Sequence, residues 1–269
     1  MDETVAALHD AAVRYGRRTI LGQVSFRACR GEFWGIVGPN GAGKTTLLKA
    51  LAGLVPLSSG SLELLGKTWR AEDGPPPSPV RRRIGVLWSP SDAPADLPVR
   101  VRDVAGFGSI ARYGLGCRER PEERAAREAA LERLGLTPLA DRLFRELSSG
   151  ERQKVHLARL VAQQPELVLL DEPTAHLDLD WQERLSDLLD RLVSERGWTV
   201  AMVTHEIERL PAGCRRLFLM RNGRMVASGP RSEVLRSEAL SELYGTPLEV
   251  IERDGRCAVL RKGLKRWTG

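Results

Sequence analysis

Apolar and polar residues alternate with a period of two at the start of the chain, a pattern typical of β-strands that bury one face. Residues 5–15 and 20–30 carry this alternation on either side of a turn at 16–19. The segment 31–38 is mostly apolar and ends at a glycine, which predicts a buried strand. Residues 44–54 then place leucines at helical spacing, so we expect a helix directly after that strand.

The pattern changes toward the middle of the chain. Residues 59–69 predict another strand with its turn, and residues 83–89 predict a short buried strand. Between them, the proline-rich stretch 72–79 predicts a surface loop with no room for a helix. Loop signals and then charged segments with helical spacing follow, so residues 90–160 are predicted to form a mostly helical lobe.

The C-terminal half alternates buried strands with helices. Residues 165–173 contain a continuous apolar run ended by acids, which is typical of a central parallel strand buried on both faces. An amphipathic helix at 181–197 and a buried strand at 198–205 follow. Two hairpins come after them, at 215–229 and 248–260, with turns at Asn222–Gly223 and Asp254–Gly255. Strands that alternate with helices predict an α/β core around a parallel sheet.

Composition narrows the class of protein. Hydrophobic residues make up 42% of the 269 positions and charged residues 28%, which fits a globular protein. No apolar run approaches the roughly 18 residues that span a bilayer, and the first ten residues carry acids where a secretion signal would be basic and apolar. A cytoplasmic protein is therefore expected.

The cysteines and the basic C-terminus give little information about function. Four cysteines lie far apart without a C-x-x-C or Cys/His cluster, namely Cys29, Cys117, Cys214 and Cys257. Reduced structural thiols are expected rather than a metal site. The net charge is +6, and the last nineteen residues hold six Lys or Arg against two acids. Such a tail could touch nucleic acid or anionic lipid, but it is more often a solvated end.

The stretch GPNGAGKT, from Gly38 to Thr45, matches the pattern G-x-x-x-x-G-K-[ST] between a predicted strand and a predicted helix. Glycines let such a loop curl so that backbone N–H groups point at nucleotide phosphates. Lys44 adds positive charge, and the hydroxyl of Thr45 can bind Mg²⁺. A chance glycine-rich turn is the alternative, but the context favours a nucleoside triphosphate site. Its residues would be Gly38, Pro39, Asn40, Gly41, Ala42, Gly43, Lys44, Thr45 and Thr46.

Two acids end the apolar run at 165–173. The carboxyl end of a parallel strand lies beside the phosphate-binding loop in such sheets. Asp171 is therefore expected to hold Mg²⁺ through water, because Mg²⁺ dehydrates reluctantly. Glu172 is the candidate base that polarises the attacking water. Paired acids can also cap a strand into a turn, which is the structural alternative.

These features together resemble the ATP-binding subunit of ATP-binding cassette (ABC) transporters. The resemblance spans residues 3–230 and rests on five stretches in the family's order, GPNGAGKTT, LSSGERQKV, LVLLDEP, TAHLD and VTH. It implies an α/β fold with a P-loop NTPase core and parallel sheet, an N-terminal antiparallel β subdomain and a helical lobe. It also implies hydrolysis of ATP to ADP and phosphate, with ATP and Mg²⁺ bound.

The resemblance assigns three further residues. Tyr15 lies where the family stacks an aromatic ring on adenine, although an ordinary strand tyrosine is the alternative. His205 closes a predicted strand and matches the histidine that contacts the γ-phosphate, so it joins Glu172 as a catalytic candidate. Asp178 matches the loop that touches the opposite subunit.

The stretch LSSGERQKV, at 147–155, runs from polar residues and glycine into a helical pattern, and a helix start offers free N–H groups to an anion. In the family this surface faces ATP held by another copy. Ser148, Ser149, Gly150 and Glu151 are therefore expected to contact ATP in trans. Ser149 and Glu151 replace a glycine and a glutamine that the family often has, and we expect function to survive the change.

The resemblance also implies partners and domain limits. Residues 1–245 would form one ATPase domain with the lobe inserted, and residues 246–269 a β-hairpin extension with a basic tail. A second cassette, as a homodimer, and integral membrane permease subunits are the expected partners, at the inner face of the cell membrane. No nucleic-acid partner is expected. An ABC ATPase with soluble partners, in iron–sulfur cluster assembly or at ribosomes or nucleic acid, is the alternative.

Two local features bear on the type of transporter. The stretch 243–260 resembles the C-terminal end of ATPases that serve iron-siderophore, haem and cobalamin uptake, while the transported substrate and its direction stay open. Ser89 stands where the family has a glutamine that reaches Mg²⁺ and the attacking water. Serine is shorter by two side-chain bonds, so we expect Ser89 not to bind the ion directly.

Overall fold

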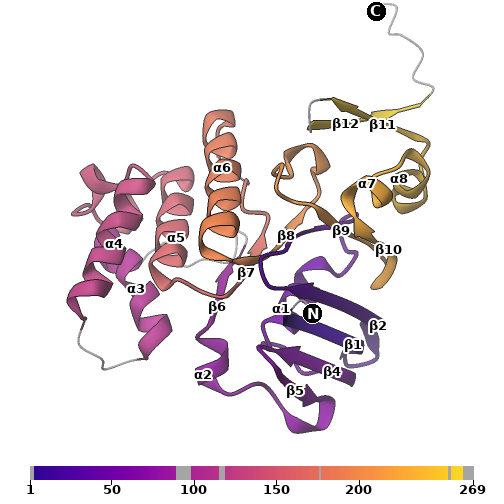
Figure 1. Cartoon of the computed structure of the whole chain (residues 1–269), viewed down its shortest axis with the longest axis horizontal. Coiled ribbons are helices and arrows are strands. Elements are labelled where there is room, and N and C mark those ends of the chain that lie inside the picture. The colour runs from indigo at the N-terminus through magenta and orange to yellow at the C-terminus, as the bar shows by residue number, and fades with distance from the viewer. Residues whose placement is uncertain (1–2, 89–97, 115–118, 176, 254–255, 263–269) are drawn as a thin grey trace, which may run out of the picture.

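The computed structural model describes residues 3–88, 98–114, 119–175, 177–253 and 256–262. A helical lobe lies at one end of the molecule, two sheets lie in the middle, and the C-terminal hairpin lies beyond them (Figure 1). Ser89, Cys117 and the predicted turn at Asp254–Gly255 fall outside the described residues. Among the described helices, none is both long and apolar enough to cross a membrane.

The larger sheet has six strands in the order β10-β9-β3-β8-β7-β6, parallel throughout except for the antiparallel edge strand β10. Its strands are β3 (Phe33–Val37), β6 (Ile84–Leu87), β7 (Leu167–Asp171), β8 (Thr199–Thr204), β9 (Arg216–Arg221) and β10 (Arg224–Pro230). Every residue of β3, β7 and β8 is buried, as their apolar sequences predict. The carboxyl ends of these strands therefore meet at one edge, where ligands bind in such folds.

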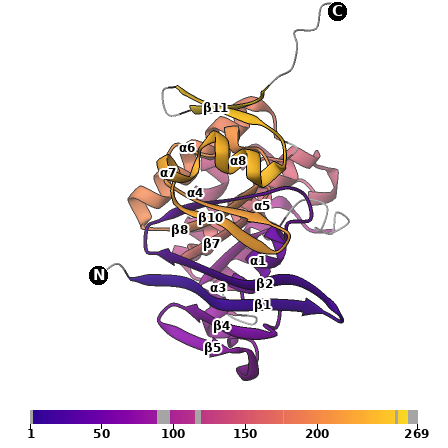
Figure 2. The ribbon, with the colours of Figure 1, turned by 90° about the vertical axis from the view of Figure 1, so that its right-hand side faces the viewer.

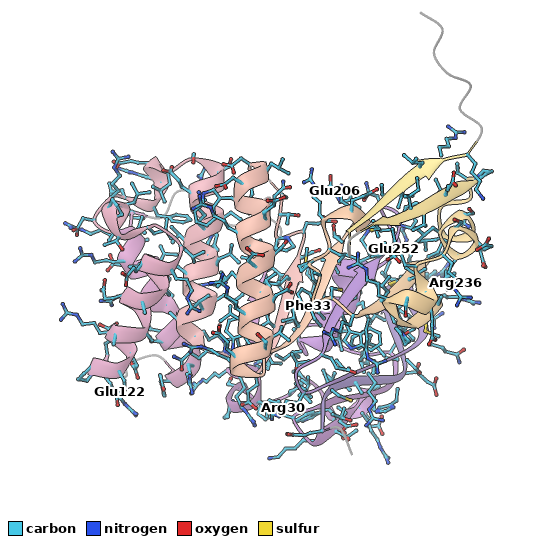
Figure 3. The ribbon with its side chains drawn as sticks, turned by 45° about the horizontal axis from the view of Figure 1, so that its top comes forward. Arg30, Phe33, Glu122, Glu206, Arg236 and Glu252 are labelled. Atoms are coloured by element: carbon cyan, nitrogen blue, oxygen red, sulfur yellow. The ribbon has the colours of Figure 1, made fainter. Side chains whose placement is uncertain are left out.

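Ion pairs join the opposite edge, where these strands begin. Nε of Arg83, before β6, lies 2.5 Å from Oε1 of Glu166, before β7. Arg30, which precedes β3 and is marked with Phe33 in Figure 3, places Nε 2.7 Å from Oε2 of Glu3. The two edges thus differ, because salt bridges hold the amino ends and loops extend from the carboxyl ends.

The smaller sheet is antiparallel and forms the predicted N-terminal β subdomain (Figure 2). Its order is β2-β1-β4-β5, with bounds β1 (Thr4–Tyr15), β2 (Arg18–Cys29), β4 (Ser59–Leu64) and β5 (Lys67–Arg70). Helix α1 (Lys44–Leu51) packs against strands of both sheets and buries Leu47, Leu48 and Leu51 between them. Leu54, expected in the same helix, lies beyond its end and is 49% exposed.

The lobe consists of α3 (Val101–Tyr113), α4 (Pro121–Arg133) and α5 (Ser149–Gln163), with two 3₁₀ turns at Thr137–Leu139 and Phe144–Glu146. Helix α5 lies along the free side of β6. Gln163 donates its side-chain amide to the carbonyl of Ile84 at 2.9 Å, and Arg159 donates Nη2 to that of Val86 at 2.9 Å. The lobe is therefore attached to the sheet by buried polar contacts as well as by apolar packing.

The C-terminal elements follow α6 (Leu179–Arg196), which lies between the lobe and the hairpin in Figure 1. They are a 3₁₀ turn, η5 (Ile207–Arg209), then α7 (Arg231–Val234), α8 (Ser237–Tyr244), β11 (Leu248–Arg253) and β12 (Arg256–Arg261). Both predicted hairpins are confirmed. The second one packs beside η5, because the Val259 N–H donates to Glu208 Oε1 at 3.2 Å.

The prediction for 72–79 was wrong in part. A 3₁₀ turn covers Ala71–Asp73, and a short helix, α2, covers Ser78–Arg81. Pro79 lies at the second position of α2, where a missing N–H costs nothing because the first turn has no intrahelical acceptor. A proline-rich stretch can therefore begin a helix although it cannot continue one.

Candidate functional site

The loop between β3 and α1 is held in its shape by glycine. Gly43 has a φ of 97°, in the left-handed region, and caps the start of α1. Gly38 approaches the next strand so closely that a Cβ there would lie 2.1 Å from the carbonyl oxygen of Met220. Side chains are thus excluded at both ends of the loop, and the N–H groups of α1 stay open toward a ligand.

Lys44 bridges this loop from inside. Its side chain is buried, with 7% exposed, and Nζ donates to the carbonyls of Gly38 at 2.7 Å and Pro39 at 3.1 Å. Burial lowers the pKa of Lys44, while the nearby carboxylates of Glu172 and Asp171 act in the opposite direction. A buried ammonium bonded to carbonyls favours an anionic ligand, because a phosphate would offset the cost of burying its charge.

Thr45 and Asp171 meet at the base of the loop. The Thr45 hydroxyl donates to Oδ2 of Asp171 at 2.7 Å, although the two residues are 126 positions apart. Asp171 is the last residue of β7 and is buried. A hydroxyl beside a carboxylate is an all-oxygen donor pair, which suits Mg²⁺ when water and phosphate oxygens complete its shell. No cluster of three or more His, Cys, Asp or Glu side chains able to hold a metal occurs in the described part of the chain.

Glu172 and His205 are the second pair. Glu172 has a φ of 50°, which is unusual for a residue with a side chain, and its N–H donates to the carbonyl of Val203 at 3.1 Å. This turn brings Oε1 of Glu172 within 2.9 Å of Nδ1 of His205. The imidazole is half-exposed and the carboxylate is 20% exposed. A carboxylate held this way can take a proton from a nearby water.

A cavity of about 430 Å³ lies between the loop and the two acids, while Gly38, Pro39 and His205 are not among the residues that line it. It is lined by Arg18, Ile20, Asn40, Gly41, Ala42, Gly43, Lys44, Thr45, Thr46, Asp171, Glu172 and Val203. Sequence reasoning missed Arg18, Ile20 and Val203. A larger cavity of about 670 Å³, beside Trp34 and Arg216, holds neither the loop nor the acids and is not the candidate site.

Arg18 lies in the wall of this cavity, and Tyr15 lies next to it. They pair with each other across the turn between β1 and β2, so Arg18 could have been found from the hairpin register around Tyr15. Arg18 lines the cavity, whereas the Tyr15 ring is 52% exposed and is not among the residues that line it. In this structure the expected aromatic contact is therefore poised beside the cavity rather than inside it.

The residues expected to act in trans do not line this cavity. Ser148 caps α5, and its backbone N–H and hydroxyl both donate to Oε2 of Glu151 at 2.8 Å. The Glu151 N–H donates back to the Ser148 hydroxyl at 3.3 Å, which completes a capping box. The N–H of Ser148 is the main cause that lowers the pKa of the Glu151 carboxyl. Glu151 thus orders the helix start, with Ser148 and Ser149 exposed and Gly150 half-buried.

Asp178 caps the next helix. Its Oδ1 accepts from the backbone N–H of Trp181 at 2.9 Å, and Asp178 is exposed at the start of α6. Its neighbour His176 lies outside the described residues. The chain therefore presents two exposed helix starts that are separate from its own cavity, as a surface for a second molecule would require.

Known proteins are similar to this chain over most of its length. The family model described as ABC transporter matches residues 21–175. The ferric enterobactin transport ATP-binding protein FepC of Escherichia coli (strain K12) is 33% identical over 254 residues, which is 94% of this chain and 92% of that protein. The hemin import ATP-binding protein HmuV of Streptomyces coelicolor is 40% identical over 264 residues, with 96% and 89% covered.

Solved structures are similar over nearly the whole chain. An inward-facing structure assigned to the metal-chelate type of ABC transporter has a TM-score of 0.78 at 24% identity and covers 96% of this chain and 97% of that one. The cassette MJ0796, dimeric in a post-hydrolysis state with ADP and Pi, has a TM-score of 0.73 at 26% identity and covers 84% and 98%. The predicted α/β fold with its P-loop core is confirmed.

Proposed function

This chain belongs to the ABC transporter family, and we propose that it powers the uptake of an iron chelate or haem as the ATP-binding subunit of an importer. Its reaction is ATP hydrolysis. The observation that carries the proposal is one cavity lined by the glycine loop, the Thr45–Asp171 pair and Glu172, with His205 bonded to Glu172 behind it. The cargo class is supported by relatives named for ferric enterobactin and hemin. The alternative with soluble partners gains no support from these relatives.

We propose that ATP binds in this cavity, with its phosphates along the N–H groups from Gly38 to Thr46. Lys44 would balance their negative charge. The Thr45 hydroxyl and, through water, the Asp171 carboxylate would hold Mg²⁺, which when bound neutralises charge on the β- and γ-phosphates. Tyr15 is proposed to stack on adenine, with Arg18 beside it.

Glu172 is the proposed general base. It would take a proton from a water whose oxygen attacks the γ-phosphorus, while the bond from that phosphorus to the β–γ bridging oxygen breaks and ADP leaves. His205, hydrogen-bonded to Oε1 of Glu172, would orient the carboxylate and contact the γ-phosphate. The low exposure of Glu172 favours this role because few bulk waters compete for its oxygens.

The second half of the site is proposed to come from another copy of this chain. Ser148, Ser149 and Gly150 at the start of α5 would face its γ-phosphate, because the N–H groups of Ser149 and Gly150 have no acceptor within the helix and the helix dipole favours an anion there. Glu151 would support that surface from behind, and Asp178 would contact the partner's loop. ATP then joins two copies head to tail, and its hydrolysis separates them.

Integral membrane permease subunits are the other proposed partners, with the lobe as their docking region at the inner face of the membrane. The ATPase domain would span residues 1–245, and residues 246–269 would form the C-terminal extension.

The transporter role can be tested by affinity purification of the protein from detergent-solubilised native membranes, followed by reconstitution of the complex in proteoliposomes loaded with ATP. We expect a membrane protein to co-elute with the chain. We also expect the proteoliposomes to move a ferric siderophore or haem across the bilayer in an ATP-dependent way. A complex that carries Lys44→Ala should not transport either compound. Isolation without any membrane protein would contradict the transporter role, and transport of free Mn²⁺ alone would contradict the cargo class.

A further inference from the structure

The two exposed helix starts are connected by one aromatic ring. The backbone N–H of Trp181 donates to Asp178, and the centroid of its indole lies 3.6 Å from Nζ of Lys154. Lys154 is in the second turn of α5, just after the turn capped by Ser148. A cation over an indole face is attracted by the ring quadrupole, and more strongly when water is partly excluded. Lys154 and Trp181 are both half-buried.

The surroundings hold this contact in place. A Cβ on Gly135, past the end of α4, would lie 4.0 Å from Cζ2 of Trp181, so the ring fills space between the lobe and α6. Burial lowers the pKa of Lys154, and the Asp178 carboxylate acts against that shift. Beside Lys154, buried Gln153 donates its side-chain amide to the carbonyl of Pro173 at 3.1 Å. Helix α5 is thus tied at two points, Pro173 and Trp181, to the chain on either side of Asp178.

We propose that Lys154 and Trp181 are positioning residues that hold the start of α5 and Asp178 as one rigid surface for the ATP of a second copy, an inference that rests on the proposed function. Two separately mobile helix starts would each lose freedom when they close on the partner. A surface joined beforehand loses less, so dimer closure needs less ATP.

The test uses the full chain carrying Glu172→Gln, which should form a dimer when ATP is added. Light scattering measures the molecular mass of the protein at each ATP concentration. Adding Trp181→Leu, which removes the ring but keeps an apolar side chain, should raise the ATP concentration for half-dimerisation about fivefold. ATP affinity at protein concentrations below dimerisation should be unchanged, because neither residue lines the cavity. Trp181→Phe keeps an aromatic face for Lys154, so this variant should dimerise at nearly the same ATP concentration as the parent.

Arg184→Met is the matched control. Arg184 also lies over the Trp181 ring, at 5.4 Å, but it belongs to the same helix α6, and its ion pair with Asp180 lies within that helix, so dimerisation should not change. Lys154→Met should raise the ATP concentration for half-dimerisation as much as Trp181→Leu does. The double variant should need no more ATP than either single variant, because both changes remove the same contact. Lys154→Met alone decides the question if the leucine variant does not fold.

The outcomes separate the two claims. If the Glu172→Gln parent stays monomeric in ATP, the proposed function fails whatever the tryptophan does. If the parent forms dimers and Trp181→Leu or Lys154→Met forms them at the same ATP concentration, the positioning role is refuted. A Trp181→Phe variant as weak as the leucine variant, or additive losses in the double variant, would also refute it.

Discussion

Glu172→Gln changes a carboxylate into an amide of nearly the same volume at the centre of the proposed reaction. Oε1 of Glu172 lies 2.9 Å from Nδ1 of His205, and an amide can keep that hydrogen bond. It cannot take a proton from water at neutral pH. A positioned general base contributes about 10²- to 10⁴-fold, so we expect turnover to fall at least about 100-fold, or about 2.7 kcal/mol of barrier.

ATP binding should survive the same change. Burial lowers the pKa of Lys44, and Glu172 is one of two carboxylates that act in the opposite direction, so the variant removes a negative charge from the region of the phosphates. Less repulsion between carboxylate and phosphate should leave the ATP dissociation constant unchanged or lower it. Phosphate release under saturating ATP and filter binding of labelled ATP measure the two quantities separately.

His205→Ala is the matched control for this prediction. It removes the partner of Glu172 but leaves the carboxylate, so its loss of turnover should be smaller than that of Glu172→Gln. The assignment of Glu172 as the base would be refuted if Glu172→Gln kept more than about one tenth of the turnover. A larger loss of turnover in His205→Ala than in Glu172→Gln would also refute it.

Three further changes test the rest of the proposed ATP site. Lys44→Ala should abolish ATP binding, because the buried ammonium is lost, and normal affinity in filter binding would contradict the phosphate site. Arg18→Ala should raise the ATP dissociation constant about tenfold, since charge-assisted contacts contribute roughly 1.5–3 kcal/mol, whereas its exposed neighbour Arg17→Ala should not. Equal effects of the two would refute a role for Arg18. Ser89→Ala should change turnover less than about threefold, under roughly 0.7 kcal/mol, and a tenfold loss at unchanged affinity would show direct Mg²⁺ binding.

The core of the site could be predicted because its geometry follows from local patterns. Thr45 lies in the first turn of the helix that follows β3, and Asp171 ends β7; they meet because parallel strands bring their carboxyl ends to one edge, and both stretches could be recognised in the sequence. Arg18 belongs to no such motif, and only the register of the first hairpin, which pairs it with Tyr15, could have indicated it. The Lys154–Trp181 contact depends on how two helices pack, which their own patterns do not encode.

The role of Glu151 illustrates a different limit. Its sequence position predicts a contact with ATP in trans, and within its own chain the Glu151 carboxylate accepts from the N–H and the hydroxyl of Ser148. Whether a residue three positions into a helix reaches back to the cap depends on the dihedrals of the cap residue, here a φ of −62° and a ψ of 162°. The capping pattern S-x-x-E was present in the sequence and could have indicated this local role.

The seat of α5 on β6 matters for solubility as well as for the ATP cycle. Among the described strands, β6 is the last of its sheet, so its outward carbonyls would offer a template to a strand of another molecule. Gln163 and Arg159 bind those carbonyls at Ile84 and Val86 and block such pairing. A substitution that loosens the lobe should therefore cause aggregation through strand pairing, even where the nucleotide loop is intact.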